Sequence, residues 1–167
     1  LLRFQRLGPA PTAMKPMLLD LISGEAERAR QGLPARIMAK VNSLQDPDII
    51  AALYDASRAG VEIKLNIRGI CCLKPGDPKH SKNIEVISVI DRFLEHARAF
   101  YFENAGGAPV ILAGSADWMP RNFFRRVEVV FPIRDPALRR WVTEEFFGDE
   151  LRDTSNTRLL HPNGAYS

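Results

Sequence analysis

The stretch RIMAKVNSLQDPDIIAALYDASRAGVEIKLNI, residues 36–67, decides the fold class of this chain. Its first six residues are mostly apolar and predict a strand, and its last seven, Val61–Ile67, alternate apolar and polar side chains as a strand does. Between them Asp46-Pro47 begins a helix and Gly60 ends it. The apolar residues of this helix are Ile49, Ile50, Leu53 and Ala56. A strand–helix–strand unit predicts two parallel strands joined by a right-handed crossover.

The remaining segments extend this unit into an α/β domain whose mixed β-sheet is flanked by helices. Met14–Gln31 has the spacing of a helix that Gly32 ends, and Pro136–Phe147 predicts another helix. Residues 149–167 predict irregular structure. Four further strands, joined by short connections, are expected at Ile84–Ile90, Arg98–Glu103, Val110–Ala113 and Val127–Ile133.

The two ends of the chain indicate a piece of a larger protein. Leu7–Pro16 contains three prolines and a glycine, a composition typical of a linker. We therefore expect residues 1–12 to be the linker or tail of a preceding domain and residues 13–167 to form one domain. The chain begins with Leu1 instead of Met, and Ser167 follows a turn-like stretch, so neither end has the features of a natural terminus.

The composition is that of a soluble globular protein, with 46% hydrophobic and 26% charged residues. No apolar run approaches the roughly 18–20 residues that span a bilayer, and no signal-like segment is present. We expect a cytoplasmic protein, with membrane association left open for the full-length chain. A net charge of +3 is too small to indicate an anionic partner, so the positions of the arginines carry more information.

The two cysteines are adjacent, at Cys71 and Cys72. Consecutive Cα atoms lie about 3.8 Å apart, which is shorter than the usual disulfide span of about 4.4–6.8 Å. Two neighbouring thiols without further ligands also make a poor zinc site. We expect two reduced thiols, as suits a cytosolic protein.

Polar side chains cluster at the ends of the predicted strands, where ligands gather in sheets of this kind. In chain order these candidates are Lys40 and Asn42, Arg68, His96, and Ser115, Asp117, Arg121 and Asn122. Each has a structural explanation when taken alone. An arginine after a strand is most often solvated, a histidine often satisfies backbone carbonyls, and an aspartate often caps a turn.

Taken together, these residues indicate a site for phosphate. Arg68 precedes Gly69, which permits the close approach of a ligand to the backbone. A guanidinium binds phosphate oxygens in bidentate fashion, and Lys40 and His96 would add further donors. The chain has no Gly-rich Walker loop and no dinucleotide fingerprint, so side chains would hold the phosphates.

A second pattern surrounds the histidine. It is His96-x-Arg98-x-x-x-x-Glu103, and it resembles the His-x-Lys-x-x-x-x-Asp pattern of the phospholipase D superfamily with Lys replaced by Arg and Asp by Glu. The segment Gly114-Ser115-Ala116-Asp117 follows it and resembles the Gly-Ser stretch of that superfamily. The fold expected from this resemblance is a phospholipase D-like domain.

Five segments, in order, resemble the last domain of bacterial polyphosphate kinase over roughly residues 10–167. They are AKVNSLQD at 39–46, IRGICCLKPG at 67–76, RFLEH at 92–96, YFEN at 101–104 and GSADWMPRN at 114–122. The resemblance implies reversible transfer of the terminal phosphate of ATP to inorganic polyphosphate, with Mg²⁺ and a phosphohistidine intermediate.

The same resemblance assigns roles to individual residues. It implies that the phosphorylated histidine belongs to a preceding phospholipase D-like domain outside this chain, that His96 is the second catalytic histidine, and that Arg68 binds ATP phosphates. Lys40, Arg121 and Asn122 match motif positions, and we expect them to bind phosphate as well. The implied partners are ATP, ADP, polyphosphate and the preceding domains. Neither nucleic acid nor a protein-held metal is implied, and homo-oligomerisation is left open.

Two other functions compete with this one. The first is a phospholipase D-type phosphodiesterase that assembles a two-histidine site as a homodimer, but Arg98 and Glu103 count against it. The second is a non-catalytic module that binds polyphosphate or another anion, which is favoured by the missing nucleophile domain. Under the kinase hypothesis we expect the isolated fragment to be inactive.

Overall fold

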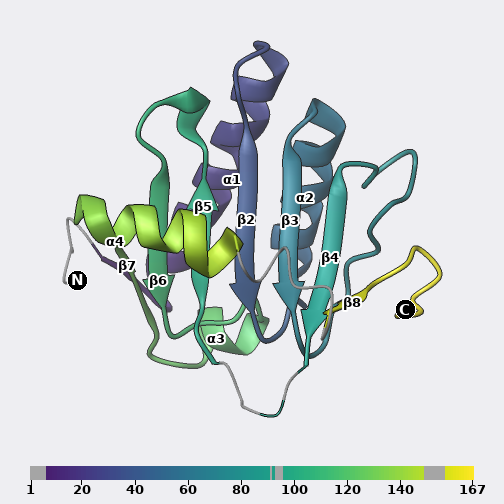
Figure 1. The fold of residues 1–167 in the computed structure, drawn as a ribbon. Helices are drawn as coiled ribbons and strands as arrows, with labels where there is room; N and C mark the ends of the chain where they lie inside the picture. The colour runs from purple at the N-terminus through teal and green to yellow at the C-terminus, as the bar shows by residue number, and fades with distance from the viewer. Residues whose placement is uncertain (1–6, 91, 93–95, 149–156) are drawn as a thin grey trace.

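An eight-stranded mixed sheet with helices on both faces forms the described part of the chain (Figure 1). The computed structural model describes residues 7–90, 92, 96–148 and 157–167. The strands are β1 (Gly8–Pro9), β2 (Arg36–Val41), β3 (Glu62–Ile67), β4 (Ile84–Val89), β5 (Ala99–Phe102), β6 (Val110–Gly114), β7 (Val129–Pro132) and β8 (Thr157–Leu159). They lie side by side in the order β1-β7-β6-β5-β2-β3-β4-β8.

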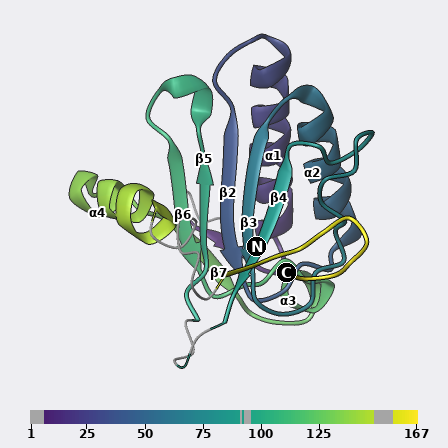
Figure 2. The ribbon, with the colours of Figure 1, turned by 45° about the vertical axis from the view of Figure 1, so that its right-hand side comes forward.

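The helices divide between the two faces and one edge of this sheet. Helices α1 (Met14–Arg30) and α2 (Pro47–Ala59) cover one face, and α4 (Pro136–Trp141) crosses the other (Figure 2). A π-helical turn (Val142–Phe146) continues α4, and a 3-10 turn (Asn104–Gly106) joins β5 to β6. The short helix α3 (Pro120–Phe124) lies beside the carboxyl ends of the central strands.

The β2–α2–β3 unit forms as the sequence predicts. Asp46 caps α2 by accepting hydrogen bonds from the backbone of Asp48 and Ile49, each at 3.1 Å. Gly60 ends the helix at φ 106°, a left-handed conformation that glycine adopts without strain. β2 pairs in parallel with β3, and β3 with β4, whereas β5, β6 and β7 add antiparallel strands. The predicted α/β domain with a mixed sheet is therefore confirmed.

Alternation along the central strands produces two cores. The larger core lies between the sheet and helices α1 and α2, and includes Leu18, Ile22, Ile37, Ala39, Leu53 and Leu65. The smaller core lies on the face crossed by α4, and consists of Met38, Ala99, Tyr101, Ile111, Val142 and Phe147. Successive residues of β2, Ile37 and Met38, thus belong to different cores, as the two-residue period of a strand requires.

Several expectations from the sequence are corrected by the structure. Residues 7–16 are more than a linker, because Gly8–Pro9 pair with β7 and Ala10 is buried. Part of the segment expected to be irregular, Thr157–Leu159, pairs with β4. Segments as short as these form strands only because a partner strand supplies their hydrogen bonds. No local sequence pattern reveals that partner. The domain boundary at residue 12 stays a prediction, and residues 149–156 lie outside the described residues.

Two further features bear on the predictions. Helix α3 was missed, although Pro120 at its first turn is a common helix start. Cys71 and Cys72 are both free, as predicted. Within the described ranges, no helix combines the length and the apolar composition that crossing a membrane requires.

Candidate functional site

Strand directions bring the candidate residues to one edge of the sheet. β2 and β3 are parallel, and β6, two strands from β2, runs in the same direction because both pair antiparallel with β5. The start of β5 therefore lies at the edge where β2, β3 and β6 end. The polar residues at this edge are Asn42 after β2, Arg68 after β3, His96 and Arg98 before β5, and Ser115 and Asp117 after β6.

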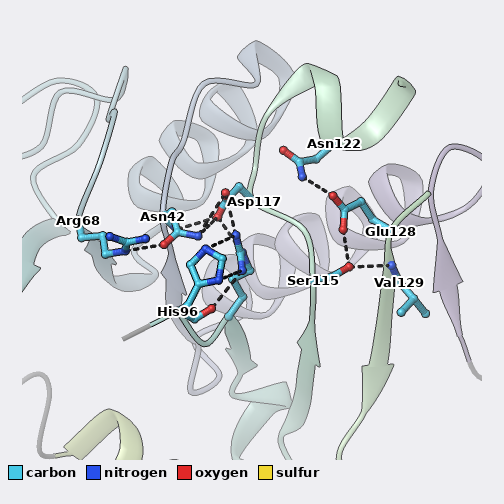
Figure 3. A network of polar contacts seen from close by, with 9 residues as sticks. Asn42, Arg68, His96, Ser115, Asp117, Asn122, Glu128 and Val129 are labelled. Atoms are coloured by element: carbon cyan, nitrogen blue, oxygen red, sulfur yellow. Dashed lines mark hydrogen bonds and ion pairs between the residues drawn. The ribbon is translucent and has the colours of Figure 1, made fainter. Parts of the chain in front are cut away.

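A continuous chain of hydrogen bonds runs across this edge, from Arg68 to His96 (Figure 3). Arg68 Nε donates to Asn42 Oδ1 at 2.5 Å. The backbone nitrogen of Asn42 donates to Asp117 Oδ1 at 2.7 Å, and its amide nitrogen lies 3.1 Å from the same oxygen. Arg98 forms a bidentate ion pair with Asp117, in which Nε donates to Oδ1 at 3.0 Å and Nη2 donates to Oδ2 at 3.2 Å. We call these five residues the edge network.

The guanidinium of Arg98 lies against the imidazole of His96. Arg98 Nη1 donates to the backbone carbonyl of His96 at 3.0 Å, and the ring nitrogens lie 3.2 and 3.4 Å from its terminal nitrogens. The Arg98 and Asp117 side chains are only 12% and 8% exposed, whereas His96 is exposed and Arg68 is half-buried. The edge network thus has a largely buried ion pair at its centre, a half-buried guanidinium at one end and an exposed imidazole at the other.

The turn that carries Arg68 packs closely on the end of β2. Gly69 donates its backbone N–H to the carbonyl of Asn42 at 2.8 Å. A Cβ atom on residue 69 would lie 2.7 Å from that carbonyl oxygen, so only glycine fits without a backbone shift. In the structure, Gly69 permits close contact with the loop after β2. The sequence alone suggests the same glycine as room for a ligand.

A second polar cluster fastens helix α3 to the same edge. Ser115 Oγ and Glu128 Oε2 share a short hydrogen bond, and Asn122 Nδ2 donates to Glu128 Oε1 at 2.6 Å. The backbone nitrogen of Val129 donates to Ser115 Oγ at 3.3 Å. Because Ser115 and Glu128 stand at the two ends of the segment that contains α3, the cluster closes this segment at its base (Figure 3).

The five predicted phosphate-site residues fall into different places. Arg68 and His96 are the two ends of the edge network, and Asn122 belongs to the α3 cluster. Lys40 is buried on the sheet face that α4 crosses, with Nζ 5.2 Å from the centroid of the Phe146 ring. Arg121 is exposed on α3 and has no side-chain bond to the edge network within the described ranges. Strand alternation explains why the Lys40 side chain lies on this face, since Lys40 is two residues after Met38 on β2.

Glu128 is the residue that sequence reasoning missed. It is 8% exposed and accepts from both Ser115 and Asn122. The available signal was a lone acidic residue inside the apolar run Val127–Ile133. A carboxylate in such a run is rarely buried unless it has partners.

The described residues do not fit a metal ion held by protein side chains alone. No group of three or more His, Cys, Asp or Glu side chains gathers among them. Asp117 is the carboxylate of the edge network, and it already accepts hydrogen bonds from Asn42 and Arg98. Mg²⁺ prefers carboxylate and phosphate oxygens that are free to coordinate it.

The chain is similar to known proteins over nearly its whole length. The model of a family described as polyphosphate kinase C-terminal domain 2 matches residues 7–167. The polyphosphate kinase of Rhodopirellula baltica is 51% identical over 162 residues, which are 97% of this chain and 19% of that protein. The crystal structure of polyphosphate kinase from Porphyromonas gingivalis superposes with a TM-score of 0.93 at 40% identity, over 98% of this chain and 25% of that one.

A more distant likeness concerns the fold alone. Nuc from Salmonella typhimurium, a phospholipase D family member, superposes with a TM-score of 0.64 at 18% identity, over 93% of this chain and 97% of that chain. The expected phospholipase D-like fold is thereby confirmed. The chain spans about a fifth to a quarter of the length of the polyphosphate kinases it matches.

Proposed function

Because the chain belongs to the polyphosphate kinase family, as its C-terminal domain 2, we propose that it supplies one half of an active site that moves the terminal phosphate of ATP reversibly onto polyphosphate. The edge network is the observation that carries the proposal. It ends in two basic groups, the half-buried Arg68 and the exposed His96, which are joined through the largely buried pair of Asp117 and Arg98. Phosphoryl transfer needs this kind of arrangement, since positioned positive donors stabilise charge on the phosphoryl oxygens.

The two ends of the edge network have different chemistry. A guanidinium binds phosphate oxygens through two parallel N–H groups, so Arg68 is the group that we propose for binding ATP phosphates. Histidine is the side chain that most often serves as a general acid or base, so we propose His96 as the catalytic histidine that pairs with the transferring phosphate or protonates its oxygen. The phosphorylated histidine of the reaction would lie in a preceding domain of the full-length protein.

The other predicted phosphate ligands, Arg121, Asn122 and Lys40, lie outside the edge network. Arg121 is exposed on α3, and Arg125 and Arg126 add two more exposed positive charges directly after this helix. We propose that Arg121 meets phosphates of the polymer farther from the reacting atoms. Asn122 orients α3 through Glu128. Direct contact of Asn122 or Lys40 with phosphate stays a prediction.

We propose that Mg²⁺ enters with the nucleotide, as the ion bound to ATP phosphates. Mg²⁺ commonly reaches a kinase site in this way, with few protein ligands of its own. A cytoplasmic location, docking of the preceding domains on this one, and self-association also stay proposals.

The alternative of a phospholipase D-type phosphodiesterase is not favoured. The likeness to Nuc is at 18% identity, whereas the polyphosphate kinase of Rhodopirellula baltica is 51% identical. Release of nitrophenol from bis-nitrophenyl phosphate by the full-length protein would support the phosphodiesterase instead.

His96→Ala in the full-length protein tests the proposed function. ATP-dependent polyphosphate synthesis should be abolished while circular dichroism stays unchanged, because an exposed imidazole leaves no core cavity behind when it is removed. His161→Ala is the matched control, since His161 lies in the C-terminal hairpin and bonds to Ser167 instead. Synthesis by His96→Ala within a few-fold of the parent protein would show that the site is misplaced.

A further inference from the structure

One carboxylate lies at the centre of a site that we propose for anionic substrates. Asp117 Oδ1 accepts from the Asn42 backbone at 2.7 Å and from Arg98 Nε at 3.0 Å, and its Oδ2 accepts from Arg98 Nη2 at 3.2 Å. The Asn42 amide nitrogen lies 3.1 and 3.4 Å from the two oxygens. A carboxylate engaged on both oxygens and paired with a guanidinium repels phosphate little, so its use lies in holding its neighbours.

We infer that Asp117 is a positioning residue, which sets the two groups proposed to contact phosphate. One arm runs through Asn42, which accepts from Arg68 Nε at 2.5 Å. The other arm runs through Arg98, which donates to the His96 carbonyl at 3.0 Å and lies against both ring nitrogens. Asp117 thereby ties the position of the proposed ATP-binding arginine to that of the proposed catalytic histidine. The inference deepens the proposed function and rests on it.

Arginine at position 98 makes this double attachment feasible. A guanidinium offers two parallel N–H groups to a carboxylate and keeps others for a third acceptor, here the His96 carbonyl. An ammonium in its place would be a point charge without that fixed fork. The Arg98 side chain is only 12% exposed. Arg98 stands where the phospholipase D pattern has Lys. Because so little of it is exposed, we expect it to act by holding its neighbours and not by contacting a substrate.

The neighbouring charges also favour a holding role. The guanidinium groups of Arg68 and Arg98 lie along one short chain of contacts, and like charges at such distances repel. The negative charge of Asp117 offsets part of this repulsion in a setting that is largely screened from water. Removing the charge should therefore let the basic side chains move apart without unfolding the sheet beneath them.

Asp117→Asn in the full-length protein tests the inference, because the amide keeps the shape and loses the charge. We expect kcat for polyphosphate synthesis to fall about 10- to 100-fold, as when an outer partner that orients a ligand-binding group is removed. KM for ATP should change by less than about threefold, because Arg68 keeps its own hydrogen bond to Asn42 Oδ1. Glu62→Gln is the matched control. It neutralises the carboxylate of an exposed pair with Arg36, at the opposite edge of the sheet, and should leave both constants unchanged.

A double-mutant cycle separates positioning from general destabilisation. If Asp117 acts through Arg98, then Asp117→Asn should cost less than about threefold in kcat once Arg98→Ala is already present. Equal losses in the two backgrounds would overturn the inference. If Asp117→Asn does not fold, Arg98→Lys is the substitute, and it should reproduce the loss in kcat. Parent-like kcat for either variant would also overturn it.

A chemical readout makes the test independent of turnover. Diethyl pyrocarbonate should modify His96 several-fold faster in Asp117→Asn than in the parent, because the released Arg98 no longer lies against the ring. Peptide mapping with His80 and His161 as internal references gives this ratio even in a protein that makes no polyphosphate. An unchanged ratio would overturn the inference alone, whereas an inactive parent protein would count against the proposed function.

Discussion

Arg68 and Arg98 belong to the same network but are placed for different tasks. Arg98 uses its fork on Asp117 and a further N–H on the His96 carbonyl. Arg68 uses only Nε, on Asn42, and its terminal nitrogens donate to no other described residue. A fixed Nε with open terminal nitrogens is a suitable arrangement for bidentate binding of a phosphate.

At the residue scale, Arg68→Ala should lower polyphosphate synthesis by about 10³–10⁵, the range seen when an arginine that stabilises a transferring phosphoryl group is lost. Arg68→Lys should recover little, because an ammonium keeps the charge and loses the fork. Arg36→Ala, at the opposite edge, is the control and should leave synthesis unchanged. Steady-state rates of the full-length variants give the answer, and near-complete rescue by lysine would contradict bidentate binding.

The adjacent cysteines differ in reactivity. Burial raises the pKa of the Cys71 thiol to about 11, despite a contact of Sγ with the Leu73 carbonyl at 3.5 Å. Cys72 is exposed. At pH 8 Cys71 is therefore a neutral thiol in the folded protein, and the thiolate is the form that reacts.

Iodoacetamide at pH 8 should therefore label Cys72 first and Cys71 much more slowly in the folded, unreduced chain. Labelling of Cys71 should speed up as the pH rises toward 11, and unfolding in denaturant should make both sites react. Mass spectrometry of the labelled peptides distinguishes the sites. Recovery of fewer than two thiols after unfolding would show that a disulfide forms, and equal rates in the folded state would contradict the burial of Cys71.

At the element scale, one buried ion pair joins the starts of α1 and α2. Lys15 Nζ lies 2.9 Å from Asp46 and 2.6 Å from Asp48, and 4.9 Å from the ring centroid of Phe124 on α3. Burial lowers the pKa of Lys15, but hydrogen bonds to Asp48 and Asp46 outweigh this and raise it overall. Lys15 therefore stays charged where three helices meet.

Asp46→Ala should lower the free energy of unfolding by about 2–3 kcal/mol. About 1 kcal/mol comes from the lost N-cap of α2, and the rest from leaving Lys15 without its buried partner. Asp135→Ala removes the N-cap of the exposed helix α4 and should cost only about 0.5–1 kcal/mol. Urea denaturation of both variants provides the comparison, and equal losses would show that the Lys15 pair contributes nothing.

At the scale of the whole molecule, the edge network is what we propose as one half of an active site. Its basic ends lie at the carboxyl edge of the sheet, and helix α3 lies beside the same edge (Figure 1). The chain spans about a fifth to a quarter of its polyphosphate kinase relatives. The proposed phosphohistidine would have to approach this edge from another domain.

The purified chain should therefore fold, bind polyphosphate weakly and show no kinase turnover. Binding to labelled polyphosphate, followed by fluorescence anisotropy, should weaken as salt rises, because the screening length falls from about 10 Å at 0.1 M to about 3 Å at 1 M. Measurable ATP-dependent synthesis by this chain alone would contradict the proposal that a second domain is needed. Binding that is insensitive to salt would contradict the role of exposed arginines.

Local patterns in the sequence determined a large part of the fold. The period of two in Val61–Ile67 and the cap signals at Asp46 and Gly60 specify their elements from neighbouring residues alone. Strand direction then placed Arg68 and His96 at one edge before any contact was known. The family resemblance rested on short segments, each readable without the fold.

Only the tertiary structure decided which of these residues touch. Asp117 and Asn42 lie 75 positions apart in sequence and meet because β6 and β2 end at the same edge. The same topology places Lys40 on the face crossed by α4, and it pairs β1 and β8 with strands far away in sequence. Periodicity reports only on neighbours along the chain. Contacts such as these depend on strand order and direction, which arise when the whole sheet forms.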